Sequence, residues 1–164
     1  MKTSKIVVLG SEAVGKTSLL YRFVYNTFKT SYKATLGVDV LKKIIEDLDV
    51  ELSLWDFSGQ KIFEKLRTQY YSEAEGALLV FDVTRRETFE AIKTWWDEAK
   101  THTGNDNLPI IVLANKTDLK PIQEVFDKQM EELSKNVKVI KTSAKTGENV
   151  EEAFRDIAMS IFGT

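Results

Sequence analysis

The sequence has no cysteine and almost no excess of charge of either sign. Without cysteine, the 164 residues can form no disulfide, bind no metal through thiolates and carry no lipid on a cysteine side chain. The formal net charge of −2 gives no electrostatic reason to expect a nucleic-acid partner or a basic membrane-binding surface. We therefore expect neither nucleic acid nor a bare membrane among the partners.

Long apolar runs are also missing. No run reaches the length of about 18 residues that a membrane-spanning helix needs. The first residues, Met1–Ser4, lead directly into a strand-like run, so we expect no signal peptide. The apolar fraction of 43% and the charged fraction of 29% are ordinary for a soluble protein. The length favours one domain over residues 1–164, and we expect it in the cytoplasm.

A glycine-rich stretch, Gly10–Thr17, fits the pattern G-x-x-x-x-G-K-[ST] of a phosphate-binding loop. Gly10 and Gly15 can adopt backbone angles closed to other residues, so the loop can turn its N–H groups inward. A helix beginning at Lys16 adds unpaired N–H groups and a cation for the phosphates, and the final threonine can ligate Mg²⁺. The alternative is a plain glycine turn. It is disfavoured because a buried strand, Lys5–Leu9, precedes the loop and helical spacing follows it.

Strand-like and helical patterns alternate along the rest of the chain. Short apolar runs predict strands at Lys5–Leu9, Val38–Ile45, Val50–Trp55, Ala77–Phe81, Ile110–Ala114 and Val137–Ile140. The acidic turn at residues 46–49 predicts an antiparallel hairpin between the second and third runs. The sequence therefore predicts an α/β fold, with a six-stranded, mostly parallel sheet, one antiparallel edge strand and helices on both faces.

Helical spacing predicts the elements that cover this sheet. Helices are expected from Lys16, from Phe89 to Ala99, from Pro121 to Leu133 and from Val150 to Ile161, with a partly helical segment up to Tyr71. Asn149, with Glu152 after it, is expected to cap the last helix. Tyr25–Gly37 is polar and aperiodic, which predicts a long exposed loop.

The pair Trp95–Trp96 and the single histidine, His102, do not indicate a binding or catalytic site. The tryptophans share helical spacing with Phe89 and Ile92, which favours packing against the core over a stacking site for bases. His102 has no catalytic partner nearby in the sequence, so we interpret it as structural or exposed.

Two loops at strand ends favour guanine over adenine. Asn115–Asp118 follows the strand that ends at Ala114, and the Asp118 carboxylate can accept bonds from N1–H and the exocyclic amine of guanine. Adenine lacks this donor pair, and a carboxylate buried against it would be left unpaired, at about 1–3 kcal/mol. Ser143–Lys145 follows another strand and can offer a backbone N–H to guanine O6. Either loop alone could be an ordinary strand-to-helix connection.

The chain resembles the Ras superfamily of small GTPases. The motifs that carry the resemblance come in that family's order and are Gly10–Thr17, Thr35, Asp56–Gln60, Asn115–Asp118 and Ser143–Lys145. The resemblance covers essentially the whole chain and implies a P-loop NTPase G domain over residues 1–164. The Rab branch is most similar, on the pieces Leu36–Asp39, Leu54–Asp56, Tyr70–Tyr71 and Leu79–Asp82. That likeness implies a switch in membrane traffic or signalling.

The resemblance also implies roles for residues. Contacts to GTP or GDP are expected from Glu12, Ala13, Val14, Gly15, Lys16, Thr17, Ser18, Phe28, Tyr32, Thr35, Gly59, Asn115, Lys116, Asp118, Leu119, Ser143, Ala144 and Lys145. Mg²⁺ is expected on Thr17 and Thr35, with Asp56 holding it through water. The catalytic set is expected to be Lys16, Thr35, Gly59, which senses the γ-phosphate, and Gln60, which orients the attacking water.

Partners follow from the same resemblance. The loops at residues 28–37 and 57–71 correspond to two switches that the γ-phosphate orders. Effectors, exchange factors and activators are expected at residues 28–40 and 57–71, on a monomer. Membrane attachment is expected only through a lipidated tail, which this sequence does not include.

Three residues depart from the family pattern. Glu12 stands where small residues are usual and would bring a negative charge near the γ-phosphate, so we expect slow hydrolysis and a poor response to arginine-finger activators. Phe57 is bulky where the family has threonine, and is expected to pack under the sheet. Lys61 reverses a charge that the family uses in nucleotide exchange.

Three functions are compatible with this pattern. The first is a regulatory GTPase, and the second is a scaffold that holds nucleotide with little turnover, supported by Glu12 and the altered Asp56–Lys61 segment. The third, a metabolic P-loop kinase, is disfavoured because the guanine motifs are intact and no Arg-rich lid is evident.

Overall fold

The structure is a computed structural model that describes residues 1–29 and 32–163. Its centre is one sheet of six strands, β1 (Lys2–Leu9), β2 (Val38–Ile45), β3 (Val50–Phe57), β4 (Gly76–Asp82), β5 (Ile110–Asn115) and β6 (Lys138–Lys141). The strand order is β2-β3-β1-β4-β5-β6, and every neighbouring pair is parallel except β2 with β3. The predicted α/β sheet with one antiparallel edge strand is confirmed.

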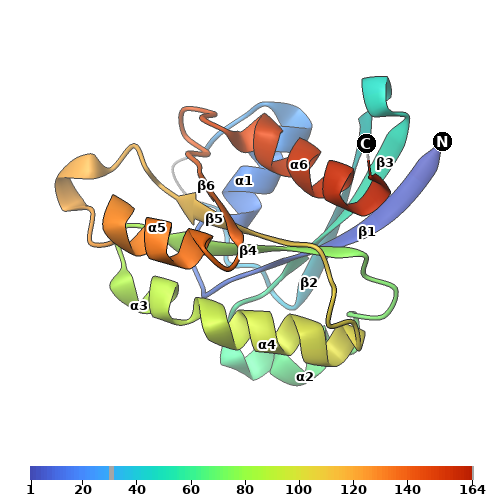
Figure 1. Cartoon of the computed structure of the whole chain (residues 1–164), viewed down its shortest axis with the longest axis horizontal. Coiled ribbons are helices and arrows are strands. Elements are labelled where there is room, and N and C mark those ends of the chain that lie inside the picture. The colour runs from blue at the N-terminus through green and yellow to red at the C-terminus, as the bar shows by residue number, and fades with distance from the viewer. Residues whose placement is uncertain (30–31, 164) are drawn as a thin grey trace.

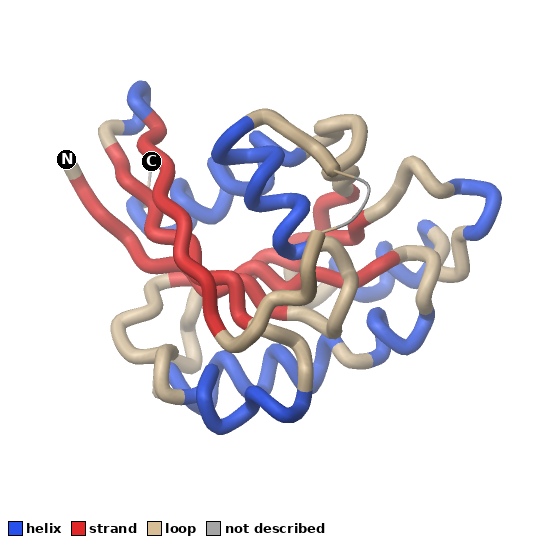
Figure 2. The backbone as a smooth tube through the Cα atoms, turned by 180° about the vertical axis from the view of Figure 1, so that it is seen from behind, coloured by secondary structure: helices blue, strands red, loops and turns tan. Residues whose placement is uncertain are grey.

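Helices lie on both faces of the sheet (Figures 1 and 2). They are α1 (Lys16–Tyr25), α2 (Glu64–Thr68), α3 (Arg86–Glu90), α4 (Ile92–Thr103), α5 (Asp127–Ser134) and α6 (Val150–Phe162). Figure 1 shows α1 and α6 on one face, and α2, α3, α4 and α5 on the other. In the part of the chain that the structure describes, no helix combines the length and apolarity needed to cross a membrane.

The core follows from the alternation of side chains along buried strands. All seven residues of β4 are buried. Leu78 and Val80 pack into the apolar layer under α1 and α6, whereas Leu79 and Phe81 pack into the layer under α4 and α5. Because successive side chains of a strand point to opposite faces, one apolar run supplies both layers.

Several predicted boundaries shift. β1 begins at Lys2, and β3 runs on to Phe57, so that Asp56 lies within the strand. The helix expected from Phe89 to Ala99 is divided, because α3 ends at Glu90 and α4 begins at Ile92. The loop expected at Tyr25–Gly37 is non-helical from residue 26 where it is described, because α1 includes Tyr25, and its residues 30 and 31 lie outside the described residues.

The helix predicted at Pro121–Leu133 is wrong over its first part. Pro121 lies in a 3-10 turn, Lys120–Ile122, and α5 begins only at Asp127. The N–H groups of Glu124 and Val125 both donate to the carbonyl of Val83, at 2.7 and 3.0 Å. These bonds hold the intervening segment against the end of β4, which prevents the helix from forming earlier.

The predicted cap of α6 is also wrong. Asn149 has a φ of 56°, in the left-handed region, and makes no side-chain cap bond to the helix. Its amide instead donates to the carbonyl of Lys141 at 2.8 Å. The side chain therefore ties the helix start to the end of β6.

Candidate functional site

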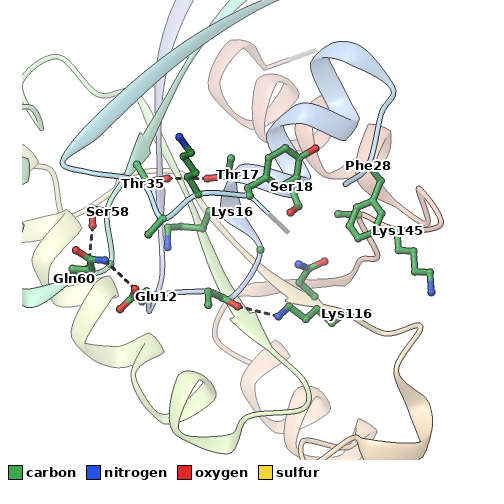
Figure 3. Close-up of a pocket in the computed structure, with 18 of the residues that line it drawn as sticks. Glu12, Lys16, Thr17, Ser18, Phe28, Thr35, Ser58, Gln60, Lys116 and Lys145 are labelled. Carbon is green, nitrogen blue, oxygen red and sulfur yellow. Dashed lines mark hydrogen bonds between the residues drawn. The ribbon is translucent and has the colours of Figure 1, made fainter. Parts of the chain in front are cut away.

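One cavity of about 470 Å³ lies at the carboxyl ends of the parallel strands, where ligands of such sheets bind. The segment after β1 supplies Gly15, the segment after β3 supplies Gln60, and the segment after β5 supplies Asp118. Phe28 and Thr35 line it from the loop between α1 and β2. Figure 3 shows these segments converging on one space from several elements.

The loop between β1 and α1 is held from its outer side by side chains distant in sequence. Arg85 donates to the carbonyl of Glu12, Lys116 to that of Ala13 and Asn115 to that of Val14, each at 2.9 Å. Across a planar trans peptide, the N–H of the next residue points opposite to such a carbonyl. The N–H groups of residues 13–15 are therefore turned away from these donors, in an arrangement that suits an anion.

Lys16 is a buried cation at the base of this loop, with a relative exposure of 6%. Its ammonium donates to the carbonyls of Gly10 at 2.9 Å and Ser11 at 3.0 Å. Burial lowers the pKa of Lys16 to about 8, against the opposing influence of the Asp56 charge. Both contacts are neutral oxygens, so a phosphate in the cavity would be a stronger partner for the charge.

Three oxygen ligands meet beside Lys16. The Thr17 hydroxyl donates to Asp56 Oδ2 at 2.6 Å and lies 2.9 Å from the Thr35 hydroxyl, which is itself 3.3 Å from the same carboxylate oxygen. Burial raises the pKa of Asp56, while the Lys16 charge and the two hydroxyl bonds oppose that shift. The other oxygen, Asp56 Oδ1, is buried without a hydrogen-bond partner among the described residues. Two hydroxyls and a carboxylate with a free oxygen fit a hard divalent cation such as Mg²⁺.

Gln60 and Glu12 contact each other at the mouth of the cavity. The Gln60 side-chain amide donates to Glu12 Oε1 at 2.9 Å (Figure 3). The Ser58 hydroxyl accepts the Gln60 backbone N–H at 3.2 Å. The Gln60 amide is therefore turned toward a carboxylate on the rim of the cavity.

The far end of the cavity presents a carboxylate and an aromatic ring. Asp118 Oδ1 accepts a bond from the Ser143 hydroxyl at 2.7 Å, which fixes the carboxylate between two strand ends. Phe28 is half-buried against the core, and Phe28 and Lys145 both line the cavity. The Asp118 carboxylate can accept hydrogen bonds from a heterocyclic base that carries N–H donors, and the Phe28 ring can cover the apolar face of such a base.

Comparison with known families agrees with this geometry. Residues 5–163 match the sequence model of the Ras family. The chain belongs to the Ras family. This membership confirms the superfamily that the motifs resembled and makes the chain a small GTPase of the P-loop, guanine-nucleotide-binding kind.

Most of the nucleotide contacts predicted for this Ras-family chain do line the cavity. They are Glu12, Ala13, Gly15, Lys16, Thr17, Ser18, Phe28, Tyr32, Thr35, Gly59, Asn115, Lys116, Asp118, Leu119, Ala144 and Lys145. Val14 and Ser143 are fully buried behind it. Val14 joins the site through its backbone, and Ser143 through its bond to Asp118.

Other residues of the site lie outside the predicted set. Lys33, Ala34 and Ser58 line the cavity. The first two lie in the 28–37 segment, and Ser58 lies in the 57–71 segment. Arg85 contacts the Glu12 carbonyl across 73 positions of sequence. No local pattern marks such a contact, so only the folded chain reveals it.

Three further expectations concern aromatic residues and the single histidine. Phe57 is buried under the sheet, 1% exposed, with its ring edge-on to Tyr71, as predicted. Trp95 belongs to the core and Trp96 packs against it, which confirms packing in place of a base-stacking site. His102 is exposed and stacks on the Tyr71 ring.

Proposed function

We propose that this Ras-family chain is a Rab-like switch that binds GTP or GDP with Mg²⁺ and hydrolyses GTP to GDP and phosphate. The observation that carries the proposal is the meeting of Lys16, Thr17, Thr35 and Asp56 at one end of a cavity whose other end holds Asp118. The first group suits a triphosphate with its cation, and Asp118 suits guanine.

The proposed binding roles follow from the contacts. Thr17, Thr35 and Asp56 would hold Mg²⁺, which when bound neutralises charge on the phosphates. Lys16 would turn from its two carbonyl partners to the phosphates, together with the N–H groups of residues 13–15. Asp118 would accept two hydrogen bonds from guanine while Phe28 covers the ring.

The proposed hydrolysis depends on Gln60 and Gly59. Gln60 would orient the attacking water toward the γ-phosphate, and the Gly59 N–H would bond to that phosphate. Gly59 already lies against the phosphate-binding loop, since a Cβ atom placed there would be 2.3 Å from the Gly10 carbonyl oxygen. For hydrolysis the Gln60 amide has to leave Glu12.

We further propose that hydrolysis is slow because of Glu12. Its carboxylate both repels the γ-phosphate and holds the Gln60 amide at 2.9 Å. Glu12→Gly should raise the single-turnover hydrolysis rate by about tenfold, the effect of removing one charged hydrogen bond of roughly 1.4 kcal/mol. Glu73→Gly is the matched control, because Glu73 is exposed in a turn with a φ of 66° that glycine tolerates. Equal rates for wild type and Glu12→Gly would refute the idea.

One experiment separates the switch from the scaffold. The scaffold is favoured by the Glu12–Gln60 contact, which withdraws the hydrolytic side chain. The purified chain is analysed for co-purifying nucleotide and then given excess GTP, with phosphate release followed over many turnovers. Continued release of phosphate supports the switch, whereas bound guanine nucleotide without any release supports the scaffold. Co-purified adenine nucleotide would contradict both.

We also propose that residues 28–40 and 57–71 bind effectors and regulators of a monomer that acts in the cytoplasm, in membrane traffic. Large apolar side chains stand exposed on these segments, with Leu36 at 75% and Ile62 at 81%. Partner binding that is equal in the GDP state and with a non-hydrolysable GTP analogue would contradict the proposal. Lys61, which is exposed, is expected to weaken exchange by factors that rely on an acidic residue there.

A further inference from the structure

Arg67 of α2 holds the backbone of Gln60 from behind the cavity. Its side chain is only 6% exposed. Nη1 donates to the Gln60 carbonyl at 3.1 Å, and the guanidinium carbon lies 4.7 Å from the centre of the Trp95 ring. The guanidinium is therefore fixed on one side by an aromatic face of the core.

Glu98 of α4 fixes the same guanidinium in its plane. Arg67 Nε donates to Glu98 Oε2 at 3.1 Å, and Nη2 donates to Oε1 at 2.9 Å. The Glu98 side chain is 11% exposed, and the Tyr71 hydroxyl donates to its Oε2. Burial raises the pKa of Tyr71, so this phenol remains a donor. A bidentate ion pair of this kind fixes the orientation of the guanidinium as well as its distance from the carboxylate.

We propose that Glu98 and Arg67 are positioning residues that set Gln60 for GTP hydrolysis. The inference rests on the proposed function and goes beyond it, because neither residue lines the nucleotide cavity. The Arg67 bond fixes the carbonyl of Gln60, and thereby the direction in which its side chain leaves the backbone. Displacement of a positioned group by about 1 Å can slow a reaction by about 100-fold.

A contribution to folding stability is not a sufficient explanation for the Arg67–Glu98 ion pair. Replacing a buried pair by neutral residues of similar volume is often neutral for stability, whereas removing one partner leaves an uncompensated buried charge. Neutral side chains can restore packing, but they cannot supply the Arg67 bond to the Gln60 carbonyl. Stability and hydrolysis can therefore be separated experimentally.

The test uses the full chain with both charges removed together, as Arg67→Met with Glu98→Gln. Methionine keeps most of the apolar volume over Trp95, and glutamine keeps an acceptor for Tyr71. We expect single-turnover GTP hydrolysis to slow by about tenfold, with the GDP dissociation constant and the melting temperature close to those of wild type. An unchanged hydrolysis rate would overturn the inference, as would a loss of rate that parallels a loss of nucleotide affinity or of melting temperature.

A second measurement separates positioning from a general disturbance. If the pair acts through Gln60, its removal should have no further effect on the rate in a Gln60→Ala background. Rate losses that multiply in the combined variant would overturn the inference. Asp97→Asn on the same helix is the matched control, because Asp97 is 61% exposed and its ion pair is with the exposed Lys93. Its rate should equal that of wild type.

The same data distinguish the proposed hydrolysis from the positioning role of Arg67 and Glu98. A wild-type chain that releases no phosphate would refute the proposed hydrolysis, and the positioning inference with it. Wild-type hydrolysis that Arg67→Met with Glu98→Gln leaves intact would refute the positioning role alone.

Discussion

Lys16 is a buried cation whose two partners are carbonyl oxygens. Burial is the main reason that its pKa falls to about 8, and the charges of Asp56 and Glu12 only partly oppose that shift. Bound phosphates would favour the charged form, so nucleotide binding should be coupled to the protonation of this one residue.

This coupling predicts a pH dependence of affinity. Above its pKa of about 8, free Lys16 is neutral, and binding must take up a proton to restore the ammonium. The affinity for GDP should therefore fall by about tenfold between about pH 7 and about pH 9. Titration calorimetry at several pH values measures it. Lys16→Met should bind GDP more weakly at every pH, and its affinity should lack the part of the pH dependence that Lys16 causes. An equal pH dependence of GDP affinity in both proteins would assign the effect to another group.

Asp118 is the second residue on which the proposed function depends. Asp118→Asn should lower the affinity for GDP by about 10- to 100-fold, because an amide cannot accept hydrogen bonds from both N–H donors of guanine. The same change should raise the relative affinity for xanthosine diphosphate. Competition binding with the three diphosphates of guanosine, xanthosine and adenosine measures the order. The Ser143 bond to Oδ1 needs only an oxygen, so the loop should keep its shape. An unaltered preference for guanine would contradict the assignment.

At the scale of elements, the segment after β3 meets the loop after β1. The Gly59 backbone lies so close that a Cβ atom would be 2.3 Å from the Gly10 oxygen and 2.7 Å from the Glu12 nitrogen. Those atoms are backbone and cannot rotate away. The approach of these two segments thus requires the absence of a side chain at this position.

Gly59→Ala should therefore push the segment after β3 away from the phosphate-binding loop after β1. We expect GTP hydrolysis to slow by about tenfold or more, since Gln60 follows directly, while GDP affinity falls less. Single-turnover rates and GDP dissociation measure the two effects. Gly104→Ala is the control, because a Cβ atom added there would meet none of the described residues within 4 Å. Its φ of 66° strains an alanine and should lower stability, but its hydrolysis rate should not change. A normal rate in Gly59→Ala would show that the close approach is dispensable.

At the scale of the whole molecule, the sheet separates two apolar layers, and Phe57 belongs to the layer under α4. It directly follows Asp56, whose carboxylate faces the cavity side with Thr17. The end of β3 therefore joins the proposed metal-binding carboxylate to the core by one peptide bond.

Phe57→Ala should lower the free energy of unfolding by about 3–5 kcal/mol, as for other buried phenylalanines. Urea unfolding at a fixed, saturating GDP concentration measures it, since bound ligand adds to stability. Phe126→Ala is the control, because Phe126 is 56% exposed and should change stability by less than about 1 kcal/mol. A small effect for Phe57→Ala would mean that the core refills the space.

Local sequence patterns are sufficient to predict the sheet, most helices and the segments that border the cavity. Periods of two and 3.6 residues are local properties, and the phosphate-binding loop depends on glycines and a lysine at fixed spacing within Gly10–Thr17. The errors arose where distant groups override local preference. The carbonyl of Val83 holds Glu124 and Val125 out of the expected helix, and Lys141 draws away the side chain expected to cap α6.

The pairing of side chains across the fold becomes visible only in the folded chain. Arg85 meets Glu12 from 73 positions away, Gln60 meets Glu12 from 48, and Arg67 meets Glu98 from 31. The last contact depends on the packing of α2 beside α4, and the first two depend on loops that the sheet brings together. None of them leaves a periodic trace in the sequence. The motifs therefore indicate a guanine nucleotide as the ligand, while the folded chain sets how tightly Gln60, the glutamine proposed to act in hydrolysis, is held.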